Sequence, residues 1–148
     1  MIEINKHNRY KLQWVDYSDP KKSFVDNKLQ EGNLNVLDLG HEFASFIKEK
    51  EEGQVRVMAI DYLSEVMERK LNQDETSKMQ FVILKNIGIM LESFLNIDAE
   101  RFLKDFSRNT GLVLLWEGLV RGNCHFFWPN SEKYSMKFED TSIQKIEP

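Results

Sequence analysis

The sequence has little cysteine, glycine or proline and no long apolar run. A single cysteine, Cys124, in 148 residues excludes a disulfide framework and a cysteine-ligated metal cluster. The 7 glycines and 3 prolines argue against a collagen-like or linker-rich chain. No apolar run approaches the roughly 18 residues of a membrane-spanning helix, and residues 1–10 lack the apolar centre of a secretory signal. These absences predict a cytoplasmic protein with no membrane contact.

The length and composition are those of one globular domain covering residues 1–148. A hydrophobic share of 41% and a charged share of 30% are typical of a folded, soluble chain and not of a disordered one. The net charge is −4, whereas a free-standing nucleic-acid binder is usually basic. We therefore expect any contact with nucleic acid to be indirect, through a protein partner.

Apolar patterns predict strands that alternate with helices. Strands are expected at residues 11–15, 34–39, 81–84 and 111–116, and a short edge strand at 143–146. Helices are expected at residues 21–29, after Gly40, at 55–71, at 87–95 and after Asp98, with a polar loop at 72–78. Residues 124–128 and 134–138 read as a hairpin joined at 129–131. Two of the strands are wholly apolar, which is typical of parallel strands buried on both faces. The pattern predicts an α/β fold of three layers, with a mainly parallel sheet and a C-terminal β-hairpin.

The longest periodic segment, residues 55–71, predicts an amphipathic helix packed on that sheet. Apolar side chains recur there at 3.6-residue spacing, Met58 and Leu63 among them. We expect both side chains to be buried.

Residues 16–23, which join the first strand to the first helix, have the place and spacing of a Walker A phosphate loop, G-x-x-x-x-G-K-[ST]. Lys22 and Ser23 match its last two positions and are the candidate nucleotide-binding residues. Asp16 and Lys21 stand where the glycines belong, and Pro20 removes one N–H donor. A lysine and a serine at a helix start are also common on a solvated surface, so this match is partial.

Two further positions depart from a nucleotide-binding site. Lys85 ends the apolar strand where a Walker B motif has the acidic residue that holds Mg²⁺. Glu117 ends the next apolar strand, where P-loop ATPases have a polar residue that senses the γ-phosphate. One hypothesis is that the Lys85 ammonium replaces the metal and pairs with Asp16 or Asp19.

The remaining reactive side chains form no recognisable constellation. The three histidines lie far apart in unlike contexts, so we expect no metal site, and nothing indicates a catalytic residue. The aromatic residues between Trp116 and Trp128 are expected to pack in the core or the hairpin, with a partner surface as the alternative.

Residues 81–118, FVILKNIGIMLESFLNIDAERFLKDFSRNTGLVLLWEG, resemble the small P-loop proteins of BREX phage-defence systems, the BrxF type. The shared pattern is an apolar strand, a Walker B-like segment, a helix, Ser-Arg-Asn, a second apolar strand and Trp-x-Gly. The resemblance extends over residues 10–146 and places the phosphate loop at residues 16–23. It implies a P-loop NTPase-like fold and a setting in phage defence.

The departures from that family pattern favour a degenerate member. Both Walker A glycines are absent, Lys85 replaces the Walker B aspartate and Gly88 replaces a glutamate-like position. The expectation is a non-catalytic interaction subunit of a bacterial phage-defence or DNA-processing complex, with protein partners and no cofactor. A homo-oligomer is compatible with this reading.

Two alternatives stay open. One is an ATP-binding and ATP-hydrolysing P-loop protein with unorthodox motifs, which would use Lys22 on the phosphates and Ser23 on Mg²⁺. The other is an α/β interaction domain without P-loop ancestry.

Overall fold

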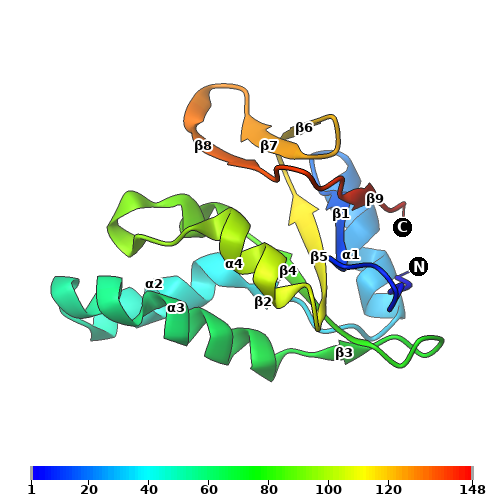
Figure 1. Ribbon diagram of the computed structural model, residues 1–148, viewed down its shortest axis with the longest axis horizontal. Helices are drawn as coiled ribbons and strands as arrows, with labels where there is room; N and C mark the ends of the chain where they lie inside the picture. Colours follow the sequence, from blue (N-terminus) through cyan, green and yellow to red (C-terminus); the bar gives the residue numbers. More distant parts are fainter. Residues whose placement is uncertain (1, 148) are drawn as a thin grey trace.

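A six-stranded sheet forms the centre of the computed structural model, which describes residues 2–147. The strands run in the order β2-β4-β5-β1-β9, and β3 pairs with β4 (Figure 1). All neighbours are parallel except β3 and β4. The strand bounds are β1 Leu12–Asp16, β2 Leu37–Asp38, β3 Asn72–Gln73, β4 Gln80–Lys85, β5 Gly111–Trp116 and β9 Gln144–Lys145. The predicted α/β class with a mainly parallel sheet is therefore confirmed, and β4 and β5 are interior strands as expected.

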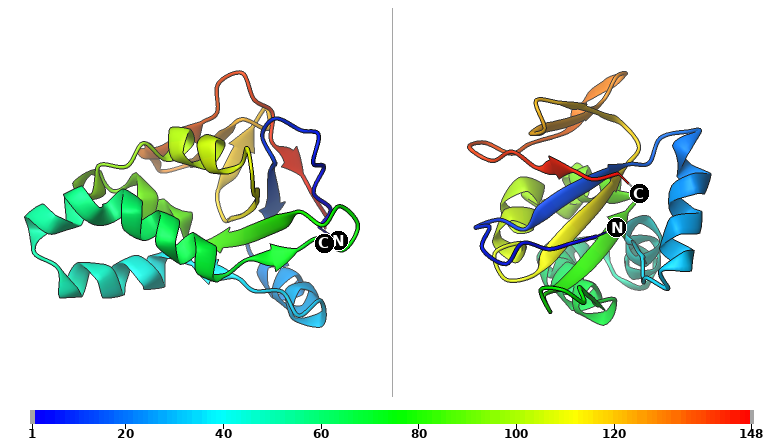
Figure 2. Two further views of the ribbon diagram at one scale, coloured as in Figure 1. Left: turned by 60° about the horizontal axis from the view of Figure 1, so that its bottom comes forward. Right: turned by 90° about the vertical axis from the view of Figure 1, so that its right-hand side faces the viewer.

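Helices cover both faces of this sheet. Their bounds are α1 Lys21–Glu31, α2 Leu39–Glu49, α3 Glu52–Arg69 and α4 Ala99–Phe106, with 3₁₀ turns η1 Ile87–Leu91 and η2 Ser93–Leu95. Alternate residues of the strands enter two separate core clusters, because successive strand side chains point to opposite faces. The smaller cluster joins α1 and the N-terminal segment to one face, and the larger joins α2, α3 and α4 to the other (Figure 2).

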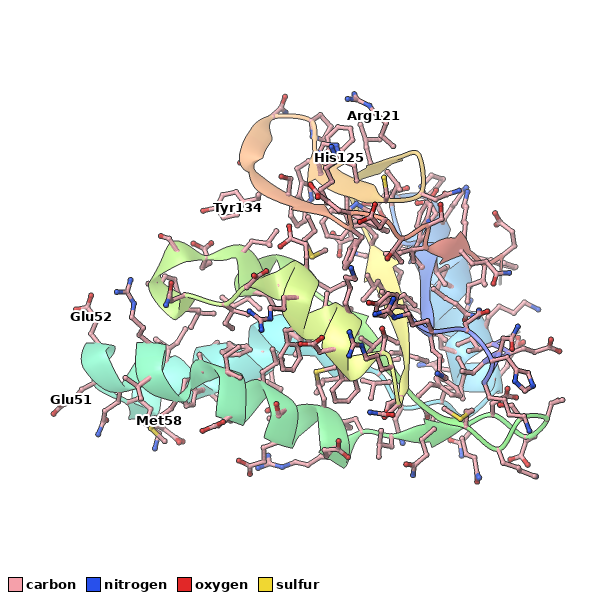
Figure 3. The ribbon with its side chains drawn as sticks, viewed as in Figure 1. Glu51, Glu52, Met58, Arg121, His125 and Tyr134 are labelled. Atoms are coloured by element: carbon pink, nitrogen blue, oxygen red, sulfur yellow. The ribbon has the colours of Figure 1, made fainter. Side chains whose placement is uncertain are left out.

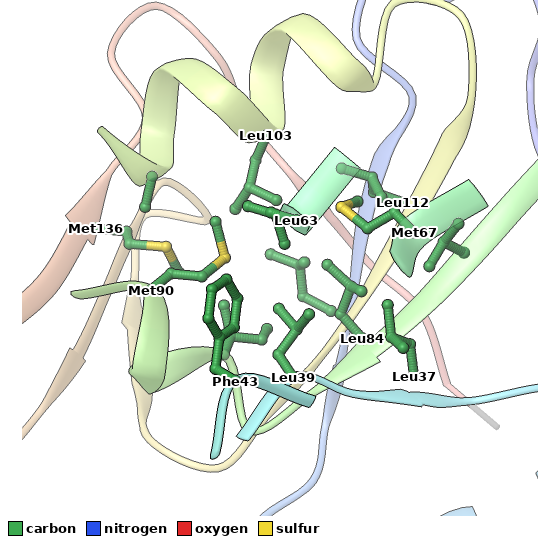
Figure 4. Close-up of a cluster of buried hydrophobic side chains, with 14 of the residues drawn as sticks. Leu37, Leu39, Phe43, Leu63, Met67, Leu84, Met90, Leu103, Leu112 and Met136 are labelled. Carbon is green, nitrogen blue, oxygen red and sulfur yellow. The ribbon is translucent and has the colours of Figure 1, made fainter. Parts of the chain in front are cut away.

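The larger cluster contains the helix predicted at residues 55–71. It is one continuous helix, α3, which begins in a capping box formed by Glu51 and Gln54. Leu63 is fully buried and lies in the same cluster as Leu84 and Leu112 of the sheet (Figure 4). Met58 was predicted to be buried, and this was wrong, because its side chain lies at the border of the buried stripe and is 40% exposed.

Three predicted segments differ from the structure. Only Leu37–Asp38 of residues 34–39 is a strand, because Asp38 caps the next helix and Leu39 already belongs to α2. Residues 87–95 form 3₁₀ turns bounded by Asn86 and Asn96, both with left-handed backbones that interrupt a helix. The predicted loop at residues 72–78 begins with the short antiparallel strand β3.

A second, three-stranded antiparallel sheet follows β5. It consists of β6 Leu119–Arg121, β7 His125–Trp128 and β8 Ser131–Lys137. The predicted hairpin is confirmed as β7 and β8. Strand β6 was not predicted, because its three residues are of mixed polarity and show no strand pattern. Phe126 packs edge-on against both Trp14 and Trp116, so the expected core packing of this aromatic segment is confirmed for these rings.

Gly118 marks the entry into this second sheet. A Cβ at this position would lie 2.5 Å from the backbone carbonyl oxygen of Phe127, so only glycine fits. The neighbouring Trp116 indole donates a hydrogen bond to the Leu119 carbonyl oxygen at 3.0 Å. Within residues 2–147, no helix has the length and apolar character needed to cross a membrane.

Candidate functional site

Three of the loops singled out in the sequence leave the same edge of the sheet. Strand β5 lies between β1 and β4, and all three are parallel, so their carboxyl ends are neighbours. Residues 16–23, called the β1–α1 loop below, lead from the last residue of β1 into the first turn of α1; Lys85 is the last residue of β4, and Glu117 follows β5. In open α/β sheets, ligands commonly bind outside the carboxyl ends of the strands. This edge is therefore the candidate site.

Asp16 is held inside the β1–α1 loop by its neighbours. Its Oδ1 atom accepts hydrogen bonds from the Ser18 N–H at 3.1 Å and from the Ser18 hydroxyl at 2.6 Å. Its Oδ2 atom lies 3.1 Å from the Lys21 ammonium. Burial opposes ionisation of Asp16, but the hydrogen bonds from Ser18 and the contact with Lys21 lower its pKa. An ionised carboxylate thus occupies the start of the loop.

Lys22 and Ser23, the two candidate phosphate-binding residues, lie in the first turn of α1. The Lys22 ammonium is 3.2 Å from Oε1 of Glu117 and 5.1 Å from the centroid of the Tyr17 ring. Ser23 is exposed. Pro20 precedes the helix as its N-cap and provides no side-chain hydrogen bond there. The fold thus brings Lys22 and Glu117 together, although the sequence analysis had treated them as separate motifs.

Backbone donors in the β1–α1 loop are also engaged. The Tyr17 N–H donates to the Trp116 carbonyl oxygen at 2.9 Å, which extends the pairing of β1 with β5. The Lys21 N–H donates to the Ser18 carbonyl oxygen at 2.8 Å. A phosphate loop works by pointing such N–H groups at the ligand. Here these donors, like that of Ser18, are directed at the protein itself.

Tyr17 is a site residue that the sequence analysis missed. It is buried, and its hydroxyl donates a 2.6 Å hydrogen bond to Asp26 of α1. Burial and the neighbouring Asp26 carboxylate raise the pKa of Tyr17, so the phenol stays protonated. Tyr17 stands in a run of turn-forming residues, so the sequence pattern gave no indication that its side chain is buried. The contact fixes α1 against the loop.

Lys85 does not contact the acidic residues of the loop. The ammonium beside Asp16 belongs to Lys21, and among the described residues Lys85 forms no ion pair with Asp16 or Asp19, so the hypothesis of such a pair was wrong. Lys85 is opposite Asp38 across the β2–β4 pair. The alternation of strand side chains therefore directs it toward a different carboxylate.

Asp38 forms a separate polar centre at the same edge. Its Oδ1 atom accepts hydrogen bonds from the His41 N–H at 3.0 Å and from the Asn86 amide at 2.9 Å. Burial opposes its ionisation, but these bonds and the positive charge of Lys85 lower its pKa. The carboxylate thereby caps α2 and holds the left-handed Asn86 in place.

A hollow of about 280 Å³ adjoins this edge. Its walls include the rings of Trp116 and Trp128, whose centroids are 4.5 Å apart, and its polar lining includes the carboxylates of Glu92 and Glu117. Such a surface suits an apolar or cationic group better than a triphosphate. Within the described part of the chain, no group of three or more His, Cys, Asp or Glu side chains could hold a metal ion.

No family model matches the chain, and no curated protein and no solved structure matches it either.

Proposed function

We propose that this chain is a P-loop-like domain that does not hydrolyse ATP and acts as an interaction subunit of a bacterial phage-defence or DNA-processing complex. The P-loop part of the proposal is supported by the arrangement of the strand ends. The resemblance places a phosphate loop after β1, a metal-holding position at the end of β4 and a γ-phosphate sensor at the end of β5. These three ends are neighbours at one edge of the sheet.

The observation that carries the non-catalytic part is that three backbone donors of the β1–α1 loop are already engaged. The N–H groups of Tyr17, Ser18 and Lys21 all donate within the protein. The Lys22 ammonium, which a phosphate would need, is already paired with Glu117. A triphosphate would have to break these contacts before it could form its own.

Electrostatics adds to this obstacle. A phosphate about 5 Å from the Asp16 carboxylate would be repelled by roughly 3 kcal/mol at an effective dielectric constant near 20. Lys21 and Lys22 would offset part of that repulsion, but each already has a carboxylate partner. Lys85 in place of an acidic residue removes the anchor for Mg²⁺ as well.

Exposed apolar side chains support the interaction part. Val57 is 79% exposed on α3, and Met58, Ile60 and Phe94 are also exposed large hydrophobic residues. Helix α3 extends with α2 beyond the edge of the sheet (Figure 1), where a partner would have free access. Apolar side chains that are exposed next to one another mark contact surfaces, and Val57, Met58 and Ile60 lie within about one turn of α3.

Isothermal titration with Mg·ATP tests the non-catalytic part. We expect no saturable heat at millimolar nucleotide with the wild type or with Lys22→Ala. Lys28→Ala, a change of another α1 lysine paired with a carboxylate, is the matched control. A low-micromolar dissociation constant that Lys22→Ala abolishes and Lys28→Ala preserves would establish the ATP-binding alternative instead.

Affinity capture from the cells that encode the protein, followed by mass spectrometry, tests the interaction part. We expect a stoichiometric protein partner that is lost with Val57→Asp/Ile60→Asp. The control is Phe24→Asp, which alters an exposed aromatic residue on α1, at the other face of the sheet. Equal capture by all three proteins would contradict the assignment of the surface to α3.

A further inference from the structure

Three cationic side chains converge on one tyrosine ring at the opposite, amino-terminal edge of the sheet. The ring centroid of Tyr10 lies 4.8 Å from Lys104 Nζ, 5.1 Å from Arg9 Cζ and 5.7 Å from Arg108 Cζ. A cation within about 6 Å of a ring centroid is attracted by the negative face of the ring. Three cations on one ring concentrate positive charge at the Tyr10 cluster, defined as Arg9, Tyr10, Lys104 and Arg108.

Among the side chains that the structure describes, the cations of the Tyr10 cluster form no ion pair with a carboxylate. Lys104 donates to the Glu139 carbonyl oxygen at 3.4 Å. The Arg108 guanidinium beside the Tyr10 side chain is the main cause of the lowered pKa of Tyr10. The cluster thus keeps positive charge available for an external anion.

A buried lysine holds together the two chain segments that form the Tyr10 cluster. Lys11 is only 9% exposed, and its ammonium donates to the carbonyl oxygens of Asn8 at 2.9 Å and Arg108 at 2.7 Å. Its N–H also donates to the Ser107 carbonyl oxygen at 2.9 Å. These bonds fasten the segment that carries Arg9 and Tyr10 to the turn that carries Arg108.

The hollow beside the Tyr10 cluster reaches the small sheet at Lys137. This residue lines the same hollow, of about 510 Å³, as Tyr10, Lys104 and Arg108. It is also the cross-strand neighbour of His125, which in turn is opposite Arg121.

These side chains lie on the outer hairpin face, defined as Arg121, His125, Phe127 and Lys137. Phe126 and Met136, which alternate with them, are fully buried. The rings of His125 and Phe127 are 4.9 Å apart, and Arg121 lies 5.1 Å from the Phe127 centroid. Arg121 projects from the small sheet away from the central sheet, at the top of the view (Figure 3). The face thus combines half-buried rings with cations.

The lining of the hollow is of mixed charge, with four acidic residues beside the four basic residues Arg101, Lys104, Arg108 and Lys137. Three of the four acidic side chains have partners within the protein. Asp98 accepts the Arg101 N–H at 3.3 Å, and Glu100 accepts the Lys137 N–H at 3.2 Å. Asp105 is 4.0 Å from the Arg101 guanidinium. Glu139 is the other acidic residue of the lining.

We propose that the Tyr10 cluster and the outer hairpin face together bind single-stranded nucleic acid, with phosphates at the cluster and bases against the rings of His125 and Phe127. Proteins that bind single strands combine a cationic track with aromatic platforms, whereas a duplex keeps the faces of its bases stacked inside. This inference goes beyond the proposed function, in which nucleic acid is reached only through a partner. It does not depend on the state of the β1–α1 loop.

Fluorescence anisotropy with a labelled oligothymidylate of about 15 nucleotides at about 50 mM salt tests the proposal. We expect Arg9→Ala/Lys104→Ala/Arg108→Ala to raise the Kd at least about tenfold. The slope of log K against log salt should fall by about 2, at roughly 0.7 per lost phosphate contact on a single strand. Phe127→Ala should raise the Kd at least about fivefold with the salt slope unchanged, because stacking releases no counterions.

The matched control is Lys48→Ala/Arg56→Ala/Lys70→Ala, which removes the same charge from exposed positions on and beside α2 and α3. We expect it to bind as the wild type does. Equal losses in the two triple variants, no saturable binding by the wild type, or equally tight binding of a duplex would each overturn the proposal. If the triple cluster variant does not fold, the exposed Arg9→Glu replaces it, and an unchanged Kd for Arg9→Glu refutes the site.

Discussion

Leu63 and Met58 form a matched pair for testing how α3 is packed. Both were expected to be buried, yet Leu63 is 0% exposed and Met58 is 40% exposed on the same helix. Truncating Leu63 to alanine removes about three carbon groups at roughly 0.8 kcal/mol each, or about 2.4 kcal/mol. Leu84 and Leu112, in the same cluster, cannot collapse fully into the space, so a cavity adds about 1 kcal/mol. We therefore expect Leu63→Ala to lower the free energy of unfolding by about 3.5 kcal/mol.

Met58→Ala should cost less than about 1 kcal/mol, because much of this side chain is already in water and alanine favours the helix. Urea unfolding followed by circular dichroism at the helical band measures both variants, with equal m-values as the check that the unfolded state is unchanged. A loss below about 1 kcal/mol for Leu63→Ala, or an equal loss for Met58→Ala, would refute the packing of α3 described above.

Two further predictions concern acid stability and the second sheet. Burial opposes ionisation of Asp74, but hydrogen bonds from the Ile4 N–H, the Ser77 hydroxyl and the Thr76 N–H lower its pKa. Its folded-state pKa thus lies below the unfolded value of about 3.9, so its stabilisation is complete above that pH and is lost as the pH falls through the folded-state pKa. Asp74→Asn should lower the free energy of unfolding by about 1–2 kcal/mol at neutral pH. It should also weaken the loss of stability at acidic pH, which urea unfolding at several pH values measures. An acid dependence equal to that of the wild type would contradict this. Gly118→Ala should cost more than about 2 kcal/mol, because a methyl group 2.5 Å from the Phe127 carbonyl oxygen must separate β6 from β7. Thermal unfolding, with the unobstructed Gly53→Ala as control, measures this, and equal melting temperatures would argue against it.

Local patterns in the sequence determined most of the elements. The apolar runs of β4 and β5 predicted strands that are buried on both faces, because such a strand has no face that contacts water. The 3.6-residue period marks α3, and the turn residues between β7 and β8 mark the hairpin. The pattern failed where a single side chain decided the outcome: Asp38 caps α2 and thereby shortens β2. The 3.6-residue spacing of apolar side chains also does not distinguish Met58, at the border of the buried face of α3, from Leu63 at its centre.

The composition of the candidate loop was readable from the sequence, but its electrostatic state was decided by tertiary structure. The sequence marked Lys22 as a candidate phosphate ligand and Glu117 as a departure from the γ-phosphate sensor of P-loop ATPases. Only the adjacency of β1 and β5 places their charges 3.2 Å apart. Strand neighbours depend on chain connections that no local pattern encodes.

The Tyr10 cluster was also decided by the tertiary structure. A net charge of −4 averages over the whole chain and predicted no direct contact with nucleic acid. Arg9 and Arg108 stand far apart in the sequence, and the buried Lys11 fastens their segments together through two carbonyl oxygens. The sequence by itself determined which segments become strands and helices, because that depends on neighbouring residues. Which charges meet at each edge of the sheet depends on strand order and was decided by the tertiary structure alone.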